Sequence, residues 1–342
     1  MSDVMPYESS RWSDLDESQL AAYENCFSGC LTRAVEQFRP HIIHSNHLWV
    51  VTALAKRLYP HIPVVASCHG SDLRQFRSIP RIAEHVAGDC RSLDAVLALS
   101  GVQKQELTGL YGIDPDRIHV TGAGFNGSLF GSEGPWQANI ADGPLRIVYA
   151  GKLSRAKGVP WLLSACAGLL NNGQNFVLDI CGGGTGAEYD ECIRLAALLG
   201  DRVRLHGNVA QPKLAELLRA ANVFVLPSFF EGLPLVLLEA LACGCRLVAT
   251  RLDGVDEVFS ALPQDVVSLV PLPRMQGVDT PVSDDEAVFE MHLADALAVQ
   301  LRNTAVPTSD EACHKVTTLL SMYSWERVFR RVEQVYKQIA DS

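Results

Sequence analysis

The chain has 342 residues, of which 48% are hydrophobic and 20% charged, so it can hold two α/β domains of a soluble globular protein. Its formal net charge of −10, from 29 basic and 39 acidic residues, argues against broad nucleic-acid binding but leaves room for a local basic pocket. No apolar run approaches the length of a membrane span and the start has no signal-peptide character, so we expect a cytoplasmic protein.

At the start of the chain, residues 19–38 are predicted to form one amphipathic helix. A doubly wound domain normally opens with a strand and a glycine-rich turn, and this chain has neither before that helix. We therefore interpret the N-terminal domain as truncated.

From about residue 40, short apolar runs alternate with longer helical patterns. The runs are unbroken, as expected for parallel strands buried on both faces, and this alternation predicts doubly wound parallel sheets. The predicted strands are 41–45, 62–67, 95–100, 117–121, 146–150, 176–181, 203–206, 223–227 and 247–250. Between the fourth and fifth runs, residues 126–144 are rich in Gly, Pro, Asn and Ser, which indicates a linker between two domains.

Within the second half, the segment Phe230–Ala240 follows a predicted strand and opens a helix. It carries Glu231 in the loop and Glu239 about one and a half turns into the helix. The N–H groups after Glu231 could hold a polyhydroxy or phosphate group. Alternatively, the glutamates only complement the helix dipole.

A second motif, Ala150–Gly158, comes directly after another predicted strand. It places Lys152 and Lys157 beside glycines, where two lysines can meet a diphosphate with little steric obstruction. The alternative is a solvated basic turn.

The chain ends in predicted helices at 285–302 and 309–322, and Ser324 could cap a last helix that reaches residue 338.

Together these features resemble the group 1, or family 4, glycosyltransferases with the GT-B fold. The resemblance runs from about residue 40 to 339 and includes the two motifs above, Cys68–Leu73 and the closing pair Ser324-Trp325. It implies two Rossmann-like α/β domains around a cleft. The implied parts are a truncated acceptor-side domain at 1–130, a linker at 131–144, a nucleotide-sugar donor domain at 145–321 and a closing helix at 322–342 that crosses back to the first domain.

The resemblance also implies roles for single residues. Lys152 and Lys157 would grip the donor diphosphate, Glu231 would bind donor-sugar hydroxyls, and Glu239 would bind the ribose. His69 would stand on the N-terminal wall near the transferred sugar. The implied catalytic set is His69, Lys152, Lys157 and Glu231, and the implied donor site is Gly151, Lys152, Lys157, Gly182, Gly183, Val209, Glu231, Gly232, Leu233 and Glu239.

The chain departs from the family pattern at three places. Lys152 stands where many relatives have arginine, which keeps the charge but loses bidentate phosphate geometry. Val120–Asn126 has Ala123 and Asn126 where relatives often have asparagine and aspartate. The family's opening strand and Gly-Gly loop have no counterpart.

Other patterns in the chain suggest different chemistry. Gly182-x-Gly184-x-x-Ala187 matches a dinucleotide-binding fingerprint, but the next strand does not end in the acidic residue that such a site needs. Asp114-Pro115-Asp116 is interpreted as a turn rather than a metal motif. The ten cysteines lack paired zinc-site spacing, so we expect neither a metal nor another cofactor.

The functional hypothesis is a retaining, metal-independent transfer of a sugar from a UDP- or GDP-type donor to a hydroxyl acceptor such as a glycan or a lipid-linked glycan. In the front-face mechanism that the family implies, the leaving diphosphate takes the acceptor proton. Peripheral membrane contact is compatible with such an acceptor, and nucleic acid is not an expected partner. The alternatives are a weak or inert nucleotide-sugar-binding protein that lacks part of its active site, and a GT-B epimerase.

Overall fold

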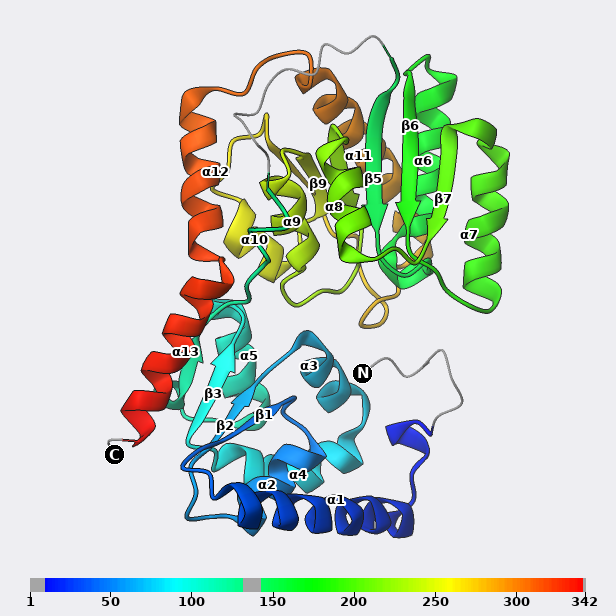
Figure 1. Ribbon diagram of the computed structural model, residues 1–342. Coiled ribbons are helices and arrows are strands. Elements are labelled where there is room, and N and C mark those ends of the chain that lie inside the picture. The colour runs from blue at the N-terminus through cyan, green and yellow to red at the C-terminus, as the bar shows by residue number, and fades with distance from the viewer. Residues whose placement is uncertain (1–9, 132–142, 341–342) are drawn as a thin grey trace. The chain divides into compact units, whose positions relative to one another are not determined.

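The structure is a computed structural model that describes residues 10–131 and 143–340 (Figure 1). The chain divides into two compact units. The first unit consists of Met1–Ala123 and Glu326–Ser342, and the second unit is Gly124–Trp325. The predicted linker at 131–144 lies mostly outside the described residues.

The first unit contains a parallel sheet with the strand order β1-β2-β3-β4. The strands are β1 (Ile43–Asn46), β2 (Val64–Ser67), β3 (Ala95–Ala98) and β4 (Ile118–Val120). Ile43 pairs with Val64 in register, and Val96 pairs with Ile118. The four runs predicted from the sequence are confirmed as strands. The central strands β2 and β3 are buried on both faces of the sheet, whereas the edge strands β1 and β4 each carry exposed residues.

Helices cover both faces of this sheet (Figure 1). Val64, Ala66 and Val96 point to one face, where they join the larger core cluster, while Val65 and Leu97 point to the other face and meet Val335 of the last helix. The helices of the unit are α1 (Glu17–Phe38), α2 (Val50–Leu58), α3 (Gly70–Ser78), α4 (Pro80–Arg91), α5 (Gly101–Tyr111) and α13 (Trp325–Ala340), with short 3-10 turns η1 (Trp12–Asp14) and η2 (Pro115–Arg117).

Two local features explain where these elements begin. Asp16 starts α1 through a reciprocal capping box with Gln19, which satisfies backbone N–H groups that a helix start leaves unpaired. The Asp114 carboxylate accepts a hydrogen bond from the backbone N–H of Asp116, 3.0 Å away, at the start of η2. The Asp-Pro-Asp segment therefore forms the turn that the sequence predicts.

The second unit contains a six-stranded parallel sheet with the order β10-β9-β8-β5-β6-β7. The strands are β5 (Leu145–Ala150), β6 (Phe176–Cys181), β7 (Val203–Gly207), β8 (Val223–Leu226), β9 (Arg246–Thr250) and β10 (Val267–Val270). Five of them confirm predicted strands, and β10 was missed. This edge strand is only four residues long and its middle residues are half-buried, so its apolar signal is weak.

Seven helices of the second unit are described, and Figure 1 shows them flanking its sheet. The longest, α11, packs on α6 and the sheet through Phe289, Leu293 and Leu297, whose four-residue spacing places them on one helix face. The helices are α6 (Val159–Asn171), α7 (Ala187–Leu198), α8 (Gln211–Arg219), α9 (Leu235–Ala242), α10 (Asp253–Phe259), α11 (Ser283–Asn303) and α12 (Asp310–Met322). The prediction of two parallel-sheet α/β domains is confirmed.

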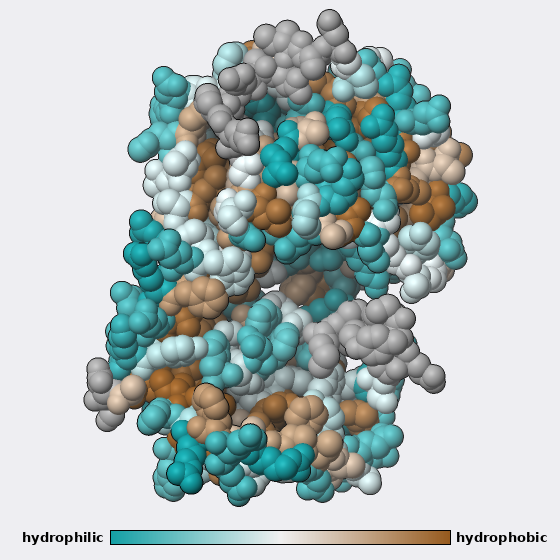
Figure 2. Space-filling view, viewed as in Figure 1, coloured by the Kyte–Doolittle hydropathy of each residue, from teal (hydrophilic) through white to brown (hydrophobic). Residues whose placement is uncertain are grey.

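The described surface is mixed in character. Hydrophilic residues are spread over the visible face of each unit, with smaller hydrophobic areas among them (Figure 2). Among the helices at 10–131 and 143–340, none combines the length and apolarity that crossing a membrane requires.

Candidate functional site

The topology of the second unit predicts where a ligand would bind. Its first strand, β5, has β6 on one side and β8 on the other, so the strand order reverses at β5. Open α/β sheets bind ligands beyond the carboxyl ends of their strands at such a switch point. The loops that leave β5, β6 and β8 there carry most of the residues that the sequence suggested for the donor.

Backbone hydrogen bonds join the loops that follow β5, β6 and β7. Gly151 N donates to Cys181 O at 2.9 Å, Leu153 N donates to Gly183 O at 2.9 Å, and Gly182 N donates to Gly207 O at 2.7 Å. Gly182 has a φ of 137°, and a Cβ there would lie 1.9 Å from the Gly151 carbonyl oxygen. Only a residue without a side chain allows this approach, and it brings Gly151, Gly182 and Gly183 together.

The β5 loop also meets the loop after β8. Phe229 N donates to Ala156 O at 3.0 Å. Gly158 has a φ of 69°, and a Cβ there would lie 2.1 Å from the Pro227 carbonyl oxygen. At this junction the Lys157 ammonium donates to the Glu231 carboxylate, with Nζ and Oε1 2.6 Å apart. The structure therefore pairs two predicted site residues that lie 74 positions apart in the sequence.

Glu239 lies in the second turn of α9. Its carboxylate is half-buried and has no hydrogen bond or ion pair to the residues that the structure describes. Burial raises the pKa of Glu239 to about 7, because removing a carboxyl group from water disfavours its charged form. Because no described residue donates to it, this carboxyl group can accept hydrogen bonds from hydroxyl groups that approach it, most strongly in its ionised form.

The remaining predicted donor residues surround this junction. Lys152 is exposed, and its backbone carbonyl accepts a 2.8 Å hydrogen bond from the buried Tyr149 hydroxyl. Leu233 is buried next to Glu231, while Gly232 packs so closely on α10 that a Cβ on Gly254 would lie 2.4 Å from its oxygen.

Val209 is half-buried in the turn between β7 and α8. Its neighbour Asn208 approaches Gly183, since a Cβ on that glycine would lie 3.3 Å from the Asn208 Oδ1. The turn after β7 therefore adjoins the glycine loop after β6.

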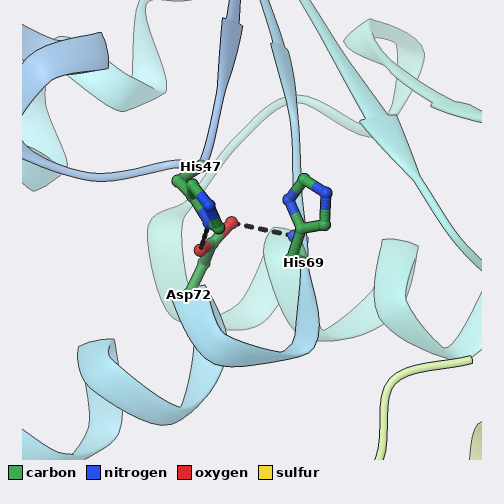
Figure 3. Close-up of side chains that lie close together, drawn as sticks. All are labelled: His47, His69 and Asp72. Carbon is green, nitrogen blue, oxygen red and sulfur yellow. Dashed lines mark hydrogen bonds and ion pairs between the residues drawn. The ribbon is translucent and has the colours of Figure 1, made fainter. Parts of the chain in front are cut away.

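In the first unit, His69 caps the start of α3 directly after β2 (Figure 3). It stands beside a buried carboxylate: Asp72, which is 1% exposed, accepts hydrogen bonds from His47 Nδ1 at 2.9 Å, from Leu48 N at 3.0 Å and from His69 N at 2.8 Å. Asp72 thereby fixes the loop that carries each histidine. The two histidine rings lie with their centroids 4.7 Å apart.

The charge states of this cluster follow from its burial and hydrogen bonds. Burial lowers the pKa of His69 more than the nearby Asp72 carboxylate raises it, so its imidazole is neutral at pH 7. Burial alone would raise the pKa of Asp72, but the hydrogen bonds from His47 and two backbone N–H groups outweigh it and lower that pKa.

His47 was missed by the sequence analysis. It has a left-handed backbone with a φ of 74°, an uncommon conformation for a residue with a side chain. The sequence could have indicated His47 only through its position. The residue directly follows β1, at the carboxyl edge of the sheet, where functional residues gather.

One ligand atom from each of His47, His69 and Asp72 lies within 4.8 Å of the others, so this cluster could hold a metal ion. However, each Asp72 carboxylate oxygen already accepts a hydrogen bond from protein groups. The expectation that the protein needs no metal stays a prediction.

Two family models match the chain. The model described as Glycosyltransferase Family 4 matches residues 20–126, and the model described as group 1 glycosyl transferases matches residues 132–265. Between them they include both lysines, both glutamates and His69.

Curated relatives agree with these matches. The chain is 31% identical over 285 residues to a D-inositol 3-phosphate glycosyltransferase of Frankia alni. The aligned region covers 74% of this chain and 67% of that protein. It is 29% identical over 272 residues to D-inositol 3-phosphate glycosyltransferase 1 of Catenulispora acidiphila, which covers 72% of this chain. The matched part spans 64% of that relative's length.

A solved structure resembles the whole fold. An Anabaena protein crystallised with UDP and glucose superposes with a TM-score of 0.68 at 18% sequence identity, over 94% of this chain and 83% of that one. At this identity the likeness concerns the fold alone.

Proposed function

We infer that this chain, which belongs to the group 1, or family 4, glycosyltransferases, transfers a sugar from a nucleoside diphosphate donor to a hydroxyl acceptor and retains the anomeric configuration. The observation that carries this proposal is the Lys157–Glu231 pair at the junction of the β5 and β8 loops. It sets a cation for phosphate beside a carboxylate for hydroxyl groups at the switch point of the sheet.

In the proposed complex, the donor diphosphate replaces Glu231 as the ion-pair partner of the Lys157 ammonium and also binds Lys152. The freed Glu231 carboxylate then accepts hydrogen bonds from hydroxyls of the transferred sugar, next to the backbone N–H groups of Gly232 and Leu233. Glu239 accepts hydrogen bonds from the ribose. The glycine loops at 151 and 182–183 admit the nucleotide closely because they carry no side chains, and Val209 borders the base.

The two lysines would also supply the main catalytic effect. Negative charge accumulates on the diphosphate as the bond to the sugar breaks, and fixed cations stabilise that charge. The leaving diphosphate then takes the proton of the acceptor hydroxyl on the same face of the sugar. This scheme uses no metal ion. The catalytic role suggested for His69, a neutral imidazole of the first unit, stays a prediction.

A ligand panel tests the donor assignment. We expect UDP or GDP, and the matching nucleotide sugar, to raise the melting temperature of the protein, because a ligand that binds only the native state stabilises it. ADP serves as the comparison. If none of these nucleotides stabilises the protein, the proposed donor site is wrong.

A second measurement separates an active enzyme from an inert binding protein. Release of the nucleoside diphosphate from the preferred donor, followed together with the anomeric configuration of the product by NMR, should show turnover with retention. Binding without any turnover would support the inert alternative, and an inverted product would contradict the retaining mechanism.

A further inference from the structure

Arg155 lies in the segment between β5 and α6 that carries Lys152 and Lys157, but it is not among the residues proposed to contact the donor. It is the first residue of a short 3-10 turn, η3 (Arg155–Lys157), so Lys157 follows it by two positions. The backbone carbonyl of Arg155 accepts a 2.8 Å hydrogen bond from Gly158 N, which closes the turn. The position of Lys157 therefore depends on how Arg155 is held.

The Arg155 side chain joins this turn to two helices. Its Nη1 donates to both carboxylate oxygens of Glu191 in α7, at 3.0 and 3.2 Å. Its Nη2 lies 3.4 and 3.5 Å from the two oxygens of Glu286 in α11. The Arg155 backbone N–H also donates to Glu188 Oε2 of α7, at 3.1 Å. A planar guanidinium with a partner on each side has a fixed orientation, so these contacts fix the start of η3.

The same guanidinium packs on an aromatic ring. The Arg155 Cζ lies 4.7 Å from the ring centroid of Trp161, within the range of a cation–π contact. Trp161 is buried and packs edge-on against Phe229, with ring centroids 5.0 Å apart. Phe229 precedes Glu231 by two positions. Arg155 is therefore connected to the β8 loop as well as to the turn that carries Lys157.

The other side chains of η3 do not connect it to these helices. Ala156 has no polar side-chain atom, and the Lys157 ammonium is paired with Glu231 of the β8 loop. When a diphosphate replaces Glu231 as the partner of Lys157, that link to the β8 loop is lost. In the proposed complex, Arg155 is then the residue of the turn whose side chain still anchors it to the domain.

From these contacts we propose that Arg155 is a positioning residue of the donor site, which holds the Lys157 ammonium in place for the diphosphate. The inference rests on the proposed function, because it concerns how the lysine meets a nucleotide sugar. Arg155 acts through Lys157 and does not contact the donor itself, since its guanidinium is occupied by Glu191, Glu286 and Trp161.

Substitution of Arg155 tests the proposal. Arg155→Met removes the guanidinium but keeps a long unbranched side chain. We expect kcat to fall about tenfold and the donor KM to change less, because a displaced Lys157 loses part of its stabilisation of the transition state. Arg155→Lys keeps a cation that can reach one glutamate and should recover most of the lost kcat. Steady-state release of the nucleoside diphosphate measures both variants.

Two controls accompany these variants. Arg194→Met removes an exposed arginine from α7 and should match wild type. The melting temperature of Arg155→Met should stay close to that of wild type, because partly exposed ion pairs contribute little to stability. A wild-type kcat in Arg155→Met, or a kcat in Arg155→Lys as low as in Arg155→Met, would overturn the proposal.

A double-mutant cycle separates positioning from a general loosening of the domain. If Arg155 acts through Lys157, Arg155→Met should have almost no further effect in a Lys157→Ala background, because the group that it positions is already absent. A second loss of about tenfold in the double variant would show independent effects and would contradict the positioning role.

Calorimetric titration of UDP and GDP distinguishes failure of this inference from failure of the proposed function. If wild type binds neither nucleotide and does not turn over, the proposed function fails and the role of Arg155 fails with it. If wild type turns over and Arg155→Met equals it, only the role of Arg155 fails. If wild type binds a nucleotide without turnover, affinity is the readout instead, and Arg155→Met should weaken it about tenfold; an unchanged affinity would overturn the inference.

Discussion

Two regions of the molecule are held together by different kinds of contact: the junction of the β5 and β8 loops in the second unit, and the cluster of His47, His69 and Asp72 in the first unit. The junction consists of loops in backbone contact at Gly151, Gly158 and Gly182, with one ion pair between Lys157 and Glu231. In the first unit, side chains gather around the buried carboxylate of Asp72, next to a pocket with aromatic walls. Backbone contacts tolerate no change, whereas side-chain contacts can be altered one at a time. Under the proposed function, specificity for the acceptor can therefore vary while the donor site stays constant.

The largest effect that distinguishes the two regions is expected at Gly182. In Gly182→Ala, the new Cβ would clash with the Gly151 carbonyl, so we expect a loss of about 3 kcal/mol in the free energy of unfolding. Denaturant titration measures it. Gly168→Ala in α6 adds a methyl group with no atom within 4 Å and should be neutral or stabilising. Equal stability of Gly182→Ala and wild type would contradict the backbone-contact account.

Lys157 tests whether the charge at the junction serves catalysis. Lys157→Ala should lower turnover on the order of a hundredfold, the loss that follows when one group stabilising a developing anion is removed. Steady-state release of the nucleoside diphosphate measures it. Lys213→Ala removes a lysine from an exposed pair with Glu216 and should retain full activity. Near-normal turnover of Lys157→Ala would remove the catalytic assignment.

In the first unit, Asp72→Asn should cost about 2 kcal/mol of stability, since a buried carboxylate that accepts hydrogen bonds from His47 and from two backbone N–H groups becomes an amide. Because folding lowers the pKa of Asp72, its contribution is present above the unfolded value of 3.8 and is lost as the pH falls through the lower folded value. Thermal unfolding at pH 7 and at lower pH measures both effects. Asp201→Asn, at an exposed site, is the control. Nucleotide affinity should not change in Asp72→Asn, and a large change would show that the regions are not independent.

Glu239 gives the smallest effect, and it depends on pH. With a pKa of about 7, the carboxylate is mostly protonated at pH 6 and mostly ionised at pH 8. If ribose hydroxyls donate to the ionised form, affinity for the nucleotide sugar, whose diphosphate keeps a constant charge here, should rise about tenfold over this interval. Calorimetric titrations at each pH measure it. Glu239→Gln should bind with a pH-independent affinity, and a flat profile in the wild type would contradict the ribose role.

The Glu239 carboxyl group also makes the free energy of unfolding depend on pH, in the direction opposite to that of Asp72. Its pKa in the folded state lies above the ordinary value of 4.5, so between about pH 4.5 and 7 the folded state holds the proton more tightly than the unfolded state. Stability therefore falls as the pH rises through this window. Glu239→Gln should lack this part of the decline.

The sequence predicted most of the fold because its signals are local. Unbroken apolar runs mark nine of the ten strands that the structure describes, and the short edge strand β10 was missed. The residues suggested for the donor lie on loops that the parallel topology brings to one sheet edge. By contrast, the pairing of Lys157 with Glu231 joins positions 74 apart and depends on how two loops approach each other.

The first-unit site could not be predicted in the same way. Two features mark His47 as a site residue, and both require the structure: its left-handed backbone and its hydrogen bond to Asp72, which lies 25 positions away. The pocket combines Trp12, Tyr23 and Trp49 from η1, α1 and the start of α2, and no local pattern links these aromatic residues. Tertiary packing alone brings them together.

The ion pair at the junction has a consequence for selectivity. Without a ligand, Lys157 and Glu231 satisfy each other, so a small anion that takes the lysine leaves a half-buried carboxylate without a partner. Inorganic phosphate should therefore compete poorly for this site. A ligand that carries both an anion and several hydroxyl groups gives each residue a new partner at once, the anion for Lys157 and the hydroxyl groups for Glu231. Under the proposed function, an intact sugar nucleotide should therefore displace this ion pair more easily than either of its hydrolysis products does.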